Sequence, residues 1–256
     1  MEKVKITLSV AIAVYNEEEK LAGCLSSVKG LADEIVVVDG GSTDRTVVIA
    51  RGFGAKIAET DNPPVFHINK EKALSACRGA WILQLDADEV VTDALKEEIV
   101  TLIAESPKEN GWYIPRKNFF LGHWMRKGGQ YPDYVIRLVR RGKAHFPSKR
   151  VHEQIAVDGY TGYLKEPLLH NTFNSVAEYW KKARSYISLS AAEMKERKLP
   201  KNMANYFYYN SIKPLFIFFL LFLRHKGFMD GYVGFLFALF SALQYPLAYA
   251  KYLRED

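Results

Sequence analysis

Short apolar runs that alternate with helical patterns dominate the first third of this 256-residue chain. The runs, rich in Val, Ile and Leu, cover about residues 6–14, 34–39, 55–59 and 80–85, and the helical patterns between them cover about residues 17–29, 43–52 and 66–78. Strands that alternate with helices are typical of a mostly parallel sheet with right-handed crossovers. The sequence therefore predicts an α/β domain whose ligands bind at the carboxyl ends of the strands.

The composition is that of a folded, basic protein. Hydrophobic residues make up 48% of the chain and charged residues 25%, which argues against extensive disorder. The 35 Lys and Arg against 29 Asp and Glu give a formal charge of +6, which favours nucleic acid, acidic lipid or a phosphorylated substrate as partner. Cys24 and Cys77 form no Cys-x-x-Cys pair, so we expect a reducing compartment. The first apolar run is too short for a signal peptide and is interpreted as a buried strand.

Polar and acidic residues follow three of the predicted strands. They occupy residues 15–17 after the first strand, 39–44 after the second and 86–89 after the fourth. Because the carboxyl ends of neighbouring parallel strands meet at one edge of a sheet, we expect the three groups to converge on one crevice.

Two of these acidic residues have the spacing of a divalent-cation site. Asp86 and Asp88 flank a single Ala, so both carboxylates project to one side of the strand end. Mg²⁺ or Mn²⁺ prefers such hard oxygen ligands together with phosphate oxygens and water, so one carboxylate can bind the cation and the other ribose or sugar hydroxyls. The alternatives are ordinary ones: an acidic loop for Asp86 and Asp88, and capping of the following helix for Asp39 and Ser42, which Thr43 or Asp44 could do equally well.

The remainder of the chain divides into two patterns. Residues from about 111 to 170 are aromatic, glycine-punctuated and β-like, which predicts antiparallel strands and loops on the acceptor side. Past about residue 174 the chain is helical and then apolar, in Pro214–Leu223 and Gly231–Ala250. The first stretch is too short to cross a bilayer and the second only just reaches the ~20 residues required. Basic and aromatic flanks suit helices that lie in a membrane interface at least as well as a spanning helix, and an intersubunit packing surface is the alternative.

Three motifs together resemble family 2 glycosyltransferases of the GT-A fold. They are Ala13-Val-Tyr-Asn-Glu17, Val38-Asp-Gly-Gly-Ser-Thr-Asp44 and Leu85-Asp-Ala-Asp-Glu89, and the resemblance spans roughly residues 5 to 170. Arg137-Leu138, Val151-His-Glu153 and Gly227-Phe-Met-Asp-Gly231 further resemble the branch with lipopolysaccharide core β-1,4-glucosyltransferases.

The resemblance implies a fold and its boundaries. The expected fold is a GT-A (Rossmann-like) mixed, mostly parallel sheet flanked by helices, with a C-terminal apolar helical extension. The glycosyltransferase domain would cover residues 1–173, with a donor half at about 1–110 and an acceptor half at about 111–173. Residues 174–256 would form the helical, membrane-associating extension.

The resemblance also implies roles for individual residues. The nucleotide-sugar site would comprise Ala13, Tyr15, Glu17, Asp39, Gly41, Asp86, Ala87 and Arg137. Within it Asp39 would contact the base and Asp86 the ribose or sugar, while Asp88 would hold the metal with His152 as a further candidate ligand. In the helix before the fourth strand, many relatives carry Lys-Asn before Ala-Leu, where this chain has Lys70-Glu71-Lys72-Ala73-Leu74. The donor contacts of that helix are therefore open.

The base that inverting transfer requires is expected to be Glu153, which must reach the acceptor hydroxyl opposite the departing diphosphate. An exposed strand carboxylate is the alternative for Glu153, with Asp133 and Asp158 as reserves for the base. His152 could ligate metal, touch the diphosphate or tune Glu153, or be structural. Arg137 could neutralise the diphosphate or a phosphorylated acceptor, or belong to a solvated basic face.

The predicted function is inverting, Mg²⁺- or Mn²⁺-dependent transfer of a sugar, with UDP-glucose expected as donor, onto a hydroxyl of a lipid-linked or lipopolysaccharide-core saccharide. Transfer to a polyprenyl phosphate and a catalytically silent membrane-associated binding protein are the alternatives. The expected location is the cytoplasmic face of the inner membrane, peripheral or monotopic. We expect no nucleic-acid partner, because no recognition motif is present, and a homo-oligomer through the C-terminal helices remains open.

Overall fold

The computed structural model describes residues 7–63, 66–147 and 154–254. Its internal contacts divide the chain into two compact units. The first comprises Met1–Arg116 and Tyr134–His170, and the second comprises Lys117–Asp133 and Asn171–Asp256. The second unit thus contains residues 117–133 in addition to the helical extension predicted from residue 174.

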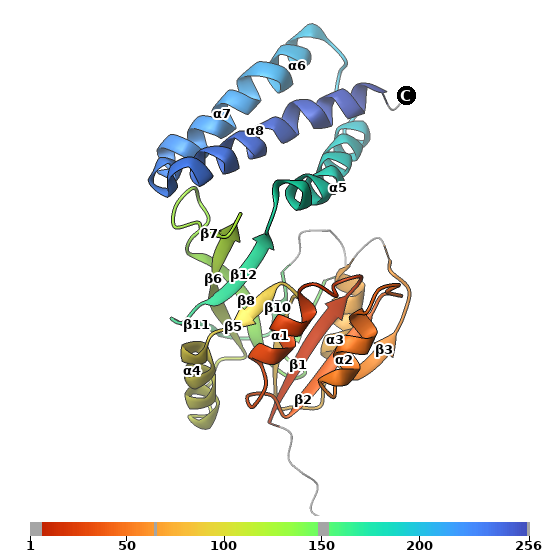
Figure 1. The fold of residues 1–256 in the computed structure, drawn as a ribbon, viewed down its shortest axis with the longest axis vertical. Helices are drawn as coiled ribbons and strands as arrows, with labels where there is room; N and C mark the ends of the chain where they lie inside the picture. The colour runs from red at the N-terminus through yellow and green to blue at the C-terminus, as the bar shows by residue number, and fades with distance from the viewer. Residues whose placement is uncertain (1–6, 64–65, 148–153, 255–256) are drawn as a thin grey trace, which may run out of the picture. The chain divides into compact units, whose positions relative to one another are not determined.

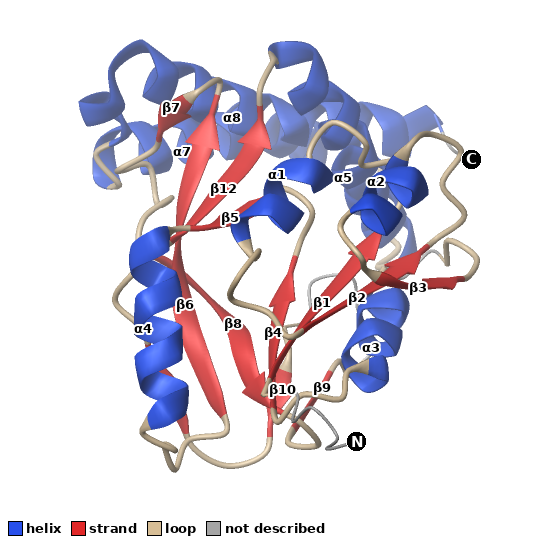
Figure 2. Cartoon of the chain, turned by 60° about the horizontal axis from the view of Figure 1, so that its bottom comes forward, coloured by secondary structure: helices blue, strands red, loops and turns tan. Residues whose placement is uncertain are grey.

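The parallel sheet of the first unit follows the pattern predicted from the sequence. Its strands are β1 (Leu8–Val14), β2 (Glu34–Asp39), β3 (Lys56–Glu59) and β4 (Trp81–Leu85), paired in parallel in the order β3-β2-β1-β4. The intervening helices are α1 (Leu21–Ser27), α2 (Thr46–Gly52) and α3 (His67–Ala76), as Figures 1 and 2 show. The predicted strands and helices are therefore confirmed, with ends shifted by a few residues.

The central strand β1 is buried on both faces, which explains its continuous apolar sequence. Val10, Ile12 and Val14 belong to a core cluster with residues of α1, α2 and α4, whereas Ala11 belongs to a second cluster with residues of α3. Because alternate side chains of a strand point to opposite faces, one seven-residue strand contributes to both cores. The sheet is thus covered by helices on each face.

Antiparallel strands extend this sheet, as expected for residues 111 to 170. The elements that follow β4 are β5 (Glu89–Val91), α4 (Asp93–Ala104), β6 (Gly111–Phe120), β7 (His123–Trp124), β8 (Asp133–Arg140), β9 (Ala144–His145), β10 (Ala156–Val157), β11 (Thr161–Tyr163) and β12 (Leu168–Phe173). The full order is β3-β2-β1-β4-β8-β6-β12-β5, with β11 and β7 paired to β6. β8 runs antiparallel to β4, and β12 runs antiparallel to β5.

The helices of the second unit pack around the long C-terminal helix. They are α5 (Val176–Glu196), α6 (Met203–Phe207), α7 (Lys213–Phe219) and α8 (Gly231–Arg254), with π-helical turns at 208–212 and 220–224 and a short 3₁₀ turn at 227–230. α8 packs against α5 and against α7, and Tyr249 is the largest fully buried side chain among them.

One helix of this unit differs from the sequence-based expectation. The apolar stretch at 214–223 was expected to be too short to cross a bilayer, but it is part of one helix from Met203 to Arg224, 22 residues long. By length and composition, helices 203–224 and 227–254 are both long and apolar enough to span a membrane. In an apolar stretch of 18 residues in each helix, none of the first and 28% of the second is buried. Such helices also occur inside soluble proteins, so length alone does not decide between these environments.

Candidate active site

The register of three parallel strands brings the predicted site residues to one edge of the sheet. β1 lies between β2 and β4, with Val14 opposite Asp39 and Ile12 opposite Leu85. Asp86, which follows Leu85, therefore leaves β4 within one residue of the level at which Asp39 ends β2. The carboxyl ends of β1, β2 and β4, which the three polar groups follow, thus lie at one edge of the sheet.

The loops after β1 and β2 are held to each other by hydrogen bonds. The backbone N–H of Asn16 donates to Oγ of Ser42 (2.8 Å), and the N–H of Thr43 donates to Oδ1 of Asn16 (2.8 Å). The N–H of Glu17 donates to Oγ1 of Thr46, also at 2.8 Å. These bonds fix the predicted nucleotide-pocket residue Tyr15, whose side chain is 40% exposed, beside the glycine turn after Asp39.

Asp39 organises that glycine turn instead of capping the following helix. Its carboxylate accepts hydrogen bonds from the N–H of Gly41 (3.0 Å), the N–H of Ser42 (2.9 Å) and the Ser42 hydroxyl (2.5 Å). Gly41 has a φ of +82°, which L-residues with side chains rarely adopt. Asp44, not Asp39, accepts from the first N–H of α2, that of Thr46. The capping alternative therefore applies to Asp44.

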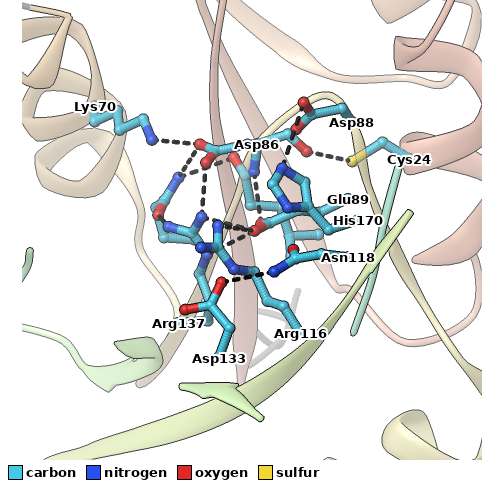
Figure 3. A network of polar contacts seen from close by, with 12 residues as sticks. Cys24, Lys70, Asp86, Asp88, Glu89, Arg116, Asn118, Asp133, Arg137 and His170 are labelled. Carbon is cyan, nitrogen blue, oxygen red and sulfur yellow. Dashed lines mark hydrogen bonds and ion pairs between the residues drawn. The ribbon is translucent and has the colours of Figure 1, made fainter. Parts of the chain in front are cut away.

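Asp86 is bound by two cations and an amide, as Figure 3 shows. Its carboxylate forms an ion pair with Nζ of Lys70 on α3, and Nη2 of Arg137 on β8 donates to Oδ2 at 2.6 Å. Nε2 of Gln84 donates to Oδ1 at 3.2 Å. Burial raises the pKa of Asp86, but Arg137 and Lys70 outweigh it and hold the pKa of this carboxyl well below its usual range.

Glu89 closes the turn that carries Asp86 and Asp88. The N–H of Asp86 donates to Oε2 of Glu89 (3.0 Å), and the N–H of Glu89 donates to the Asp86 carbonyl (3.0 Å). Nη2 of Arg137 donates to Oε1 of Glu89 at 2.7 Å, and Arg116 lies 3.5 Å from the same oxygen. Glu89 is fully buried, so these contacts compensate the desolvation of its charge.

Arg137 is therefore committed to the protein itself. It is 6% exposed, and its guanidinium contacts Gln84, Asp86 and Glu89. A guanidinium in this position orients the acidic turn; the described contacts leave its fork directed at carboxylates instead of outward to a diphosphate. The solvated-face alternative does not hold for Arg137.

Asp88 has a different partner, His170 on β12. Figure 3 shows the two side chains facing each other. Nε2 of His170 lies 3.5 Å from Oδ2 of Asp88, and each side chain is 13% exposed. Antiparallel pairing of β12 with β5 places His170 opposite Glu89. Sequence reasoning missed His170; its only signal was a lone histidine in an apolar run. The partner strand lies about eighty residues away, so local pattern could not locate it.

The donor set at this point fits a divalent cation that is shared with a ligand. Asp88 and His170 supply one carboxylate and one imidazole, while Asp86 is already neutralised by Lys70 and Arg137. Within the described ranges no group of three or more metal-binding side chains comes together. Mg²⁺ commonly takes only one or two carboxylates and completes its shell with substrate phosphates and water.

Of the four remaining candidates, the structure describes two. Glu153 and His152 lie outside the described residues. Asp158 follows β10, and its N–H donates to the carbonyl of Lys143. Two residues before Lys143, the N–H of Arg141 donates to the carbonyl of Ala80, which directly precedes β4. Asp158 therefore lies near the end of β4 that is opposite to Asp86. This position does not suit Asp158 as a base for the strand-end site. In the second unit, Asp133 accepts a hydrogen bond from Asn118 at 3.0 Å.

Comparison with known proteins adds three findings. The family model described as glycosyl transferase family 2 matches residues 9–184. The chain is 32% identical to the lipopolysaccharide core biosynthesis glycosyltransferase LpsC of Rhizobium meliloti, over 96% of this chain and 92% of that protein. It is 27% identical to an uncharacterized glycosyltransferase of Rickettsia bellii, over 97% of this chain and 86% of that protein.

Among solved structures, S. aureus TarS residues 1–349 resembles this chain with a TM-score of 0.51 and 15% identity, covering 98% of this chain and 92% of TarS 1–349. The same fragment in complex with UDP-GlcNAc matches with a TM-score of 0.50 and 17% identity, covering 93% and 81%. At this identity the likeness concerns the fold.

Proposed function

The chain belongs to glycosyltransferase family 2 and has the GT-A fold, and from that premise we propose that it transfers a sugar from a nucleoside diphosphate with inversion at the anomeric carbon. The observation that carries this proposal is the position of Asp39 and Asp86 at the carboxyl ends of β2 and β4, the two strands that flank β1. That edge is where open α/β sheets bind nucleotides. The fixed turn after Asp39 and the neutralised Asp86 would form the two sides of the donor site.

A divalent cation, Mg²⁺ or Mn²⁺, is proposed to bind Asp88. A bound cation stabilises the charge that grows on a leaving diphosphate. Asp88 suits this role because Asp86 is already paired with Lys70 and Arg137, whereas the described partner of Asp88 is an imidazole that can itself ligate Mn²⁺. Asp86 would then accept hydrogen bonds from ribose or sugar hydroxyls.

Glu153 remains our proposal for the base, with His152 beside it as a further candidate ligand or tuning group. The base must take the proton of the acceptor hydroxyl as the bond to the anomeric carbon forms and the bond to the diphosphate breaks. Comparing Glu153→Gln on a saccharide acceptor and on a polyprenyl phosphate distinguishes the two transfer reactions. Only transfer to the hydroxyl should collapse, because an ionised phosphate needs no base.

The proposed acceptor is a lipid-linked or lipopolysaccharide-core saccharide, and UDP-glucose is the proposed donor. Support for the acceptor comes from the similarity to LpsC, a protein of lipopolysaccharide core biosynthesis. Support for a uridine nucleotide comes from TarS, whose structure in complex with UDP-GlcNAc has a similar fold. The two apolar C-terminal helices support association with a membrane. Their basic flanks support the finer proposal of peripheral attachment at the cytoplasmic face.

The experiment that tests this function screens nucleotide sugars for thermal stabilisation, with and without Mn²⁺. A donor at about 100 times its Kd should stabilise the protein by about 2.7 kcal/mol. Asp88→Asn should abolish the Mn²⁺-dependent part of the shift, whereas Asp93→Asn, an exposed acidic control on α4, should not. Full turnover in chelator, or an Asp88→Ala enzyme as active as the parent, would contradict the cation's role. Binding without turnover would instead indicate a silent binding protein.

A further inference from the structure

A buried acid in the second unit fixes two basic segments to each other. Asp230, whose side chain is 1% exposed, accepts hydrogen bonds from the N–H of Arg126 (3.0 Å) and the N–H of Lys127 (2.8 Å). The N–H of Gly128 donates to the carbonyl of His225 at 2.9 Å. The loop after β7 and the turn before α8 are therefore one structure, although about a hundred residues separate them.

Together, the loop after β7 and the turn before α8 carry four exposed cations. Arg126 and Lys127 from the loop, and Arg224 and Lys226 from the turn, all have exposed side chains. Asp230 is the one acidic residue in segments 121–130 and 220–232, and its carboxylate is used internally. The stretch that leads up to Asp230, residues 197–229, contains no Asp or Glu at all. The loop and the turn thus form a cationic surface, and neither segment carries an exposed carboxylate that would neutralise it.

The turn retains a lysine where glycine would be less strained. Lys226 has a φ of +57°, in the left-handed region, which costs a side-chain-bearing residue on the order of 1 kcal/mol. This turn places the exposed Lys226 between the end of helix 203–224 and the 3₁₀ turn at 227–230.

Large exposed apolar side chains lie in the same segment as Arg224 and Lys226. Leu223 is 53% exposed, Phe228 49%, Met229 60% and Tyr232 73%. Exposed aromatic and apolar groups interleaved with Lys and Arg are typical of segments that lie at a bilayer surface, where the apolar groups enter the interface and the cations meet phosphates. A soluble phosphate would need the cations but not these neighbours.

We propose that the surface formed by residues 126–129 and 223–232, held by Asp230, is a docking site for anionic phospholipid headgroups. It deepens the proposed membrane attachment, on which it rests, by naming the contact and the lipid chemistry. Because Asp230 fixes the spacing of the two basic segments, the surface is a structured site and net charge alone does not account for it.

The first test measures co-sedimentation with phosphatidylcholine vesicles that do or do not contain about one-third phosphatidylglycerol. Arg224→Gln/Lys226→Gln and Arg126→Gln/Lys127→Gln should each weaken binding to the anionic vesicles by about tenfold or more. The control Lys181→Gln/Arg184→Gln also removes two positive charges, but from the exposed face of α5, and it should change binding much less. Equal losses in all three variants would overturn the proposal in favour of diffuse electrostatics.

The second test uses Asp230→Asn, which makes the protein more positive. If only diffuse electrostatics acts, this variant should bind anionic vesicles more tightly. If the hydrogen bonds from Arg126 and Lys127 to Asp230 hold the site together, it should bind them severalfold more weakly. Circular dichroism at the assay temperature verifies that the helices persist; if they do not, the two Gln pairs decide. Binding of Asp230→Asn as tight as that of the parent would overturn the proposed role of Asp230.

Two competition arms identify the source of the phosphate. Vesicle binding that millimolar inorganic phosphate abolishes, or that equals the affinity for a nucleic-acid duplex at the same salt concentration, would contradict a headgroup site. Both tests are run without donor or acceptor, so their failure leaves the proposed transfer reaction untouched, and failure of the transfer reaction does not affect them.

Discussion

Arg137 links two acidic residues that would otherwise repel each other at the end of β4. Burial lowers the pKa of its guanidinium, but Asp86 and then Glu89 outweigh burial and raise that pKa above its ordinary value, so the group stays charged at any working pH. One cation therefore orients two of the three carboxylates of the turn, those of Asp86 and Glu89.

This arrangement predicts a large effect of removing the guanidinium. Arg137→Met should lower the free energy of unfolding by about 3–5 kcal/mol, because it leaves the buried Glu89 without its closest cation. Urea denaturation measures the change. Arg141→Met, at an exposed position, is the control and should stay within about 0.5 kcal/mol of the parent. A loss below 1 kcal/mol in Arg137→Met would show that the pairing is weak.

At the scale of the elements, Glu34 ties together the amino ends of β1, β2, β3 and β4. It accepts hydrogen bonds from the Ser9 hydroxyl (2.6 Å) on β1, from Lys56 (2.7 Å) on β3, and from the N–H and Nε of Arg78 (both 2.8 Å) before β4. Burial raises the pKa of Glu34, but these donors outweigh it and lower the pKa to about 2. The clamp lies at the edge of the sheet opposite to the candidate site.

The clamp predicts a pH-dependent contribution to stability. A folded-state pKa below the unfolded value of about 4.3 stabilises the protein above that pH and is lost as the pH falls toward 2. Glu34→Gln should therefore cost about 2–3 kcal/mol at pH 7, and the difference from the parent should shrink between about pH 5 and pH 2. Denaturant unfolding at several pH values measures it; a difference independent of pH would contradict the assignment to Glu34.

The start of α8 depends on a close backbone contact at Gly234. A Cβ at this position would lie 2.0 Å from the carbonyl oxygen of Gly227, a distance that no side chain tolerates. Gly234→Ala should lower stability by about 1–3 kcal/mol, since the turn must shift. Gly23→Ala in α1, where a Cβ would meet nothing within 4 Å, should instead gain about 0.5–1 kcal/mol from helix propensity. Thermal unfolding compares the two variants, and equal effects would contradict the contact.

At the scale of the whole molecule, the proposed membrane attachment rests on the basic excess and on the two apolar helices. The formal charge is +6, and none of the apolar 18-residue stretch in helix 203–224 is buried. Peripheral attachment through anionic lipid weakens with salt, whereas a spanning helix does not.

Fractionation of expressing cells distinguishes these two modes. We expect the protein in the membrane fraction at low salt and its release by about 0.5–1 M NaCl, where the Debye length falls to about 3–4 Å. An unrelated spanning protein serves as the control and should need detergent. Retention of this protein until detergent is added would contradict peripheral attachment.

The sequence by itself determined the parallel sheet, its helices and the edge at which the acidic groups meet. These follow from local patterns: the period of apolar residues fixes each element, and parallel strands bring their carboxyl ends together. Asp39 and Asp86 could therefore be placed before any coordinates were known.

Only the tertiary structure decided which side chains act together. Arg137 pairs with Asp86 across 51 residues, His170 meets Asp88 through the pairing of β12 with β5, and Asp230 accepts from backbone N–H groups more than a hundred residues away. Helix 203–224 likewise exceeded its expected length. Such contacts depend on how distant segments pack, because hydrogen bonds and ion pairs act over a few ångströms in space, whatever the separation along the chain.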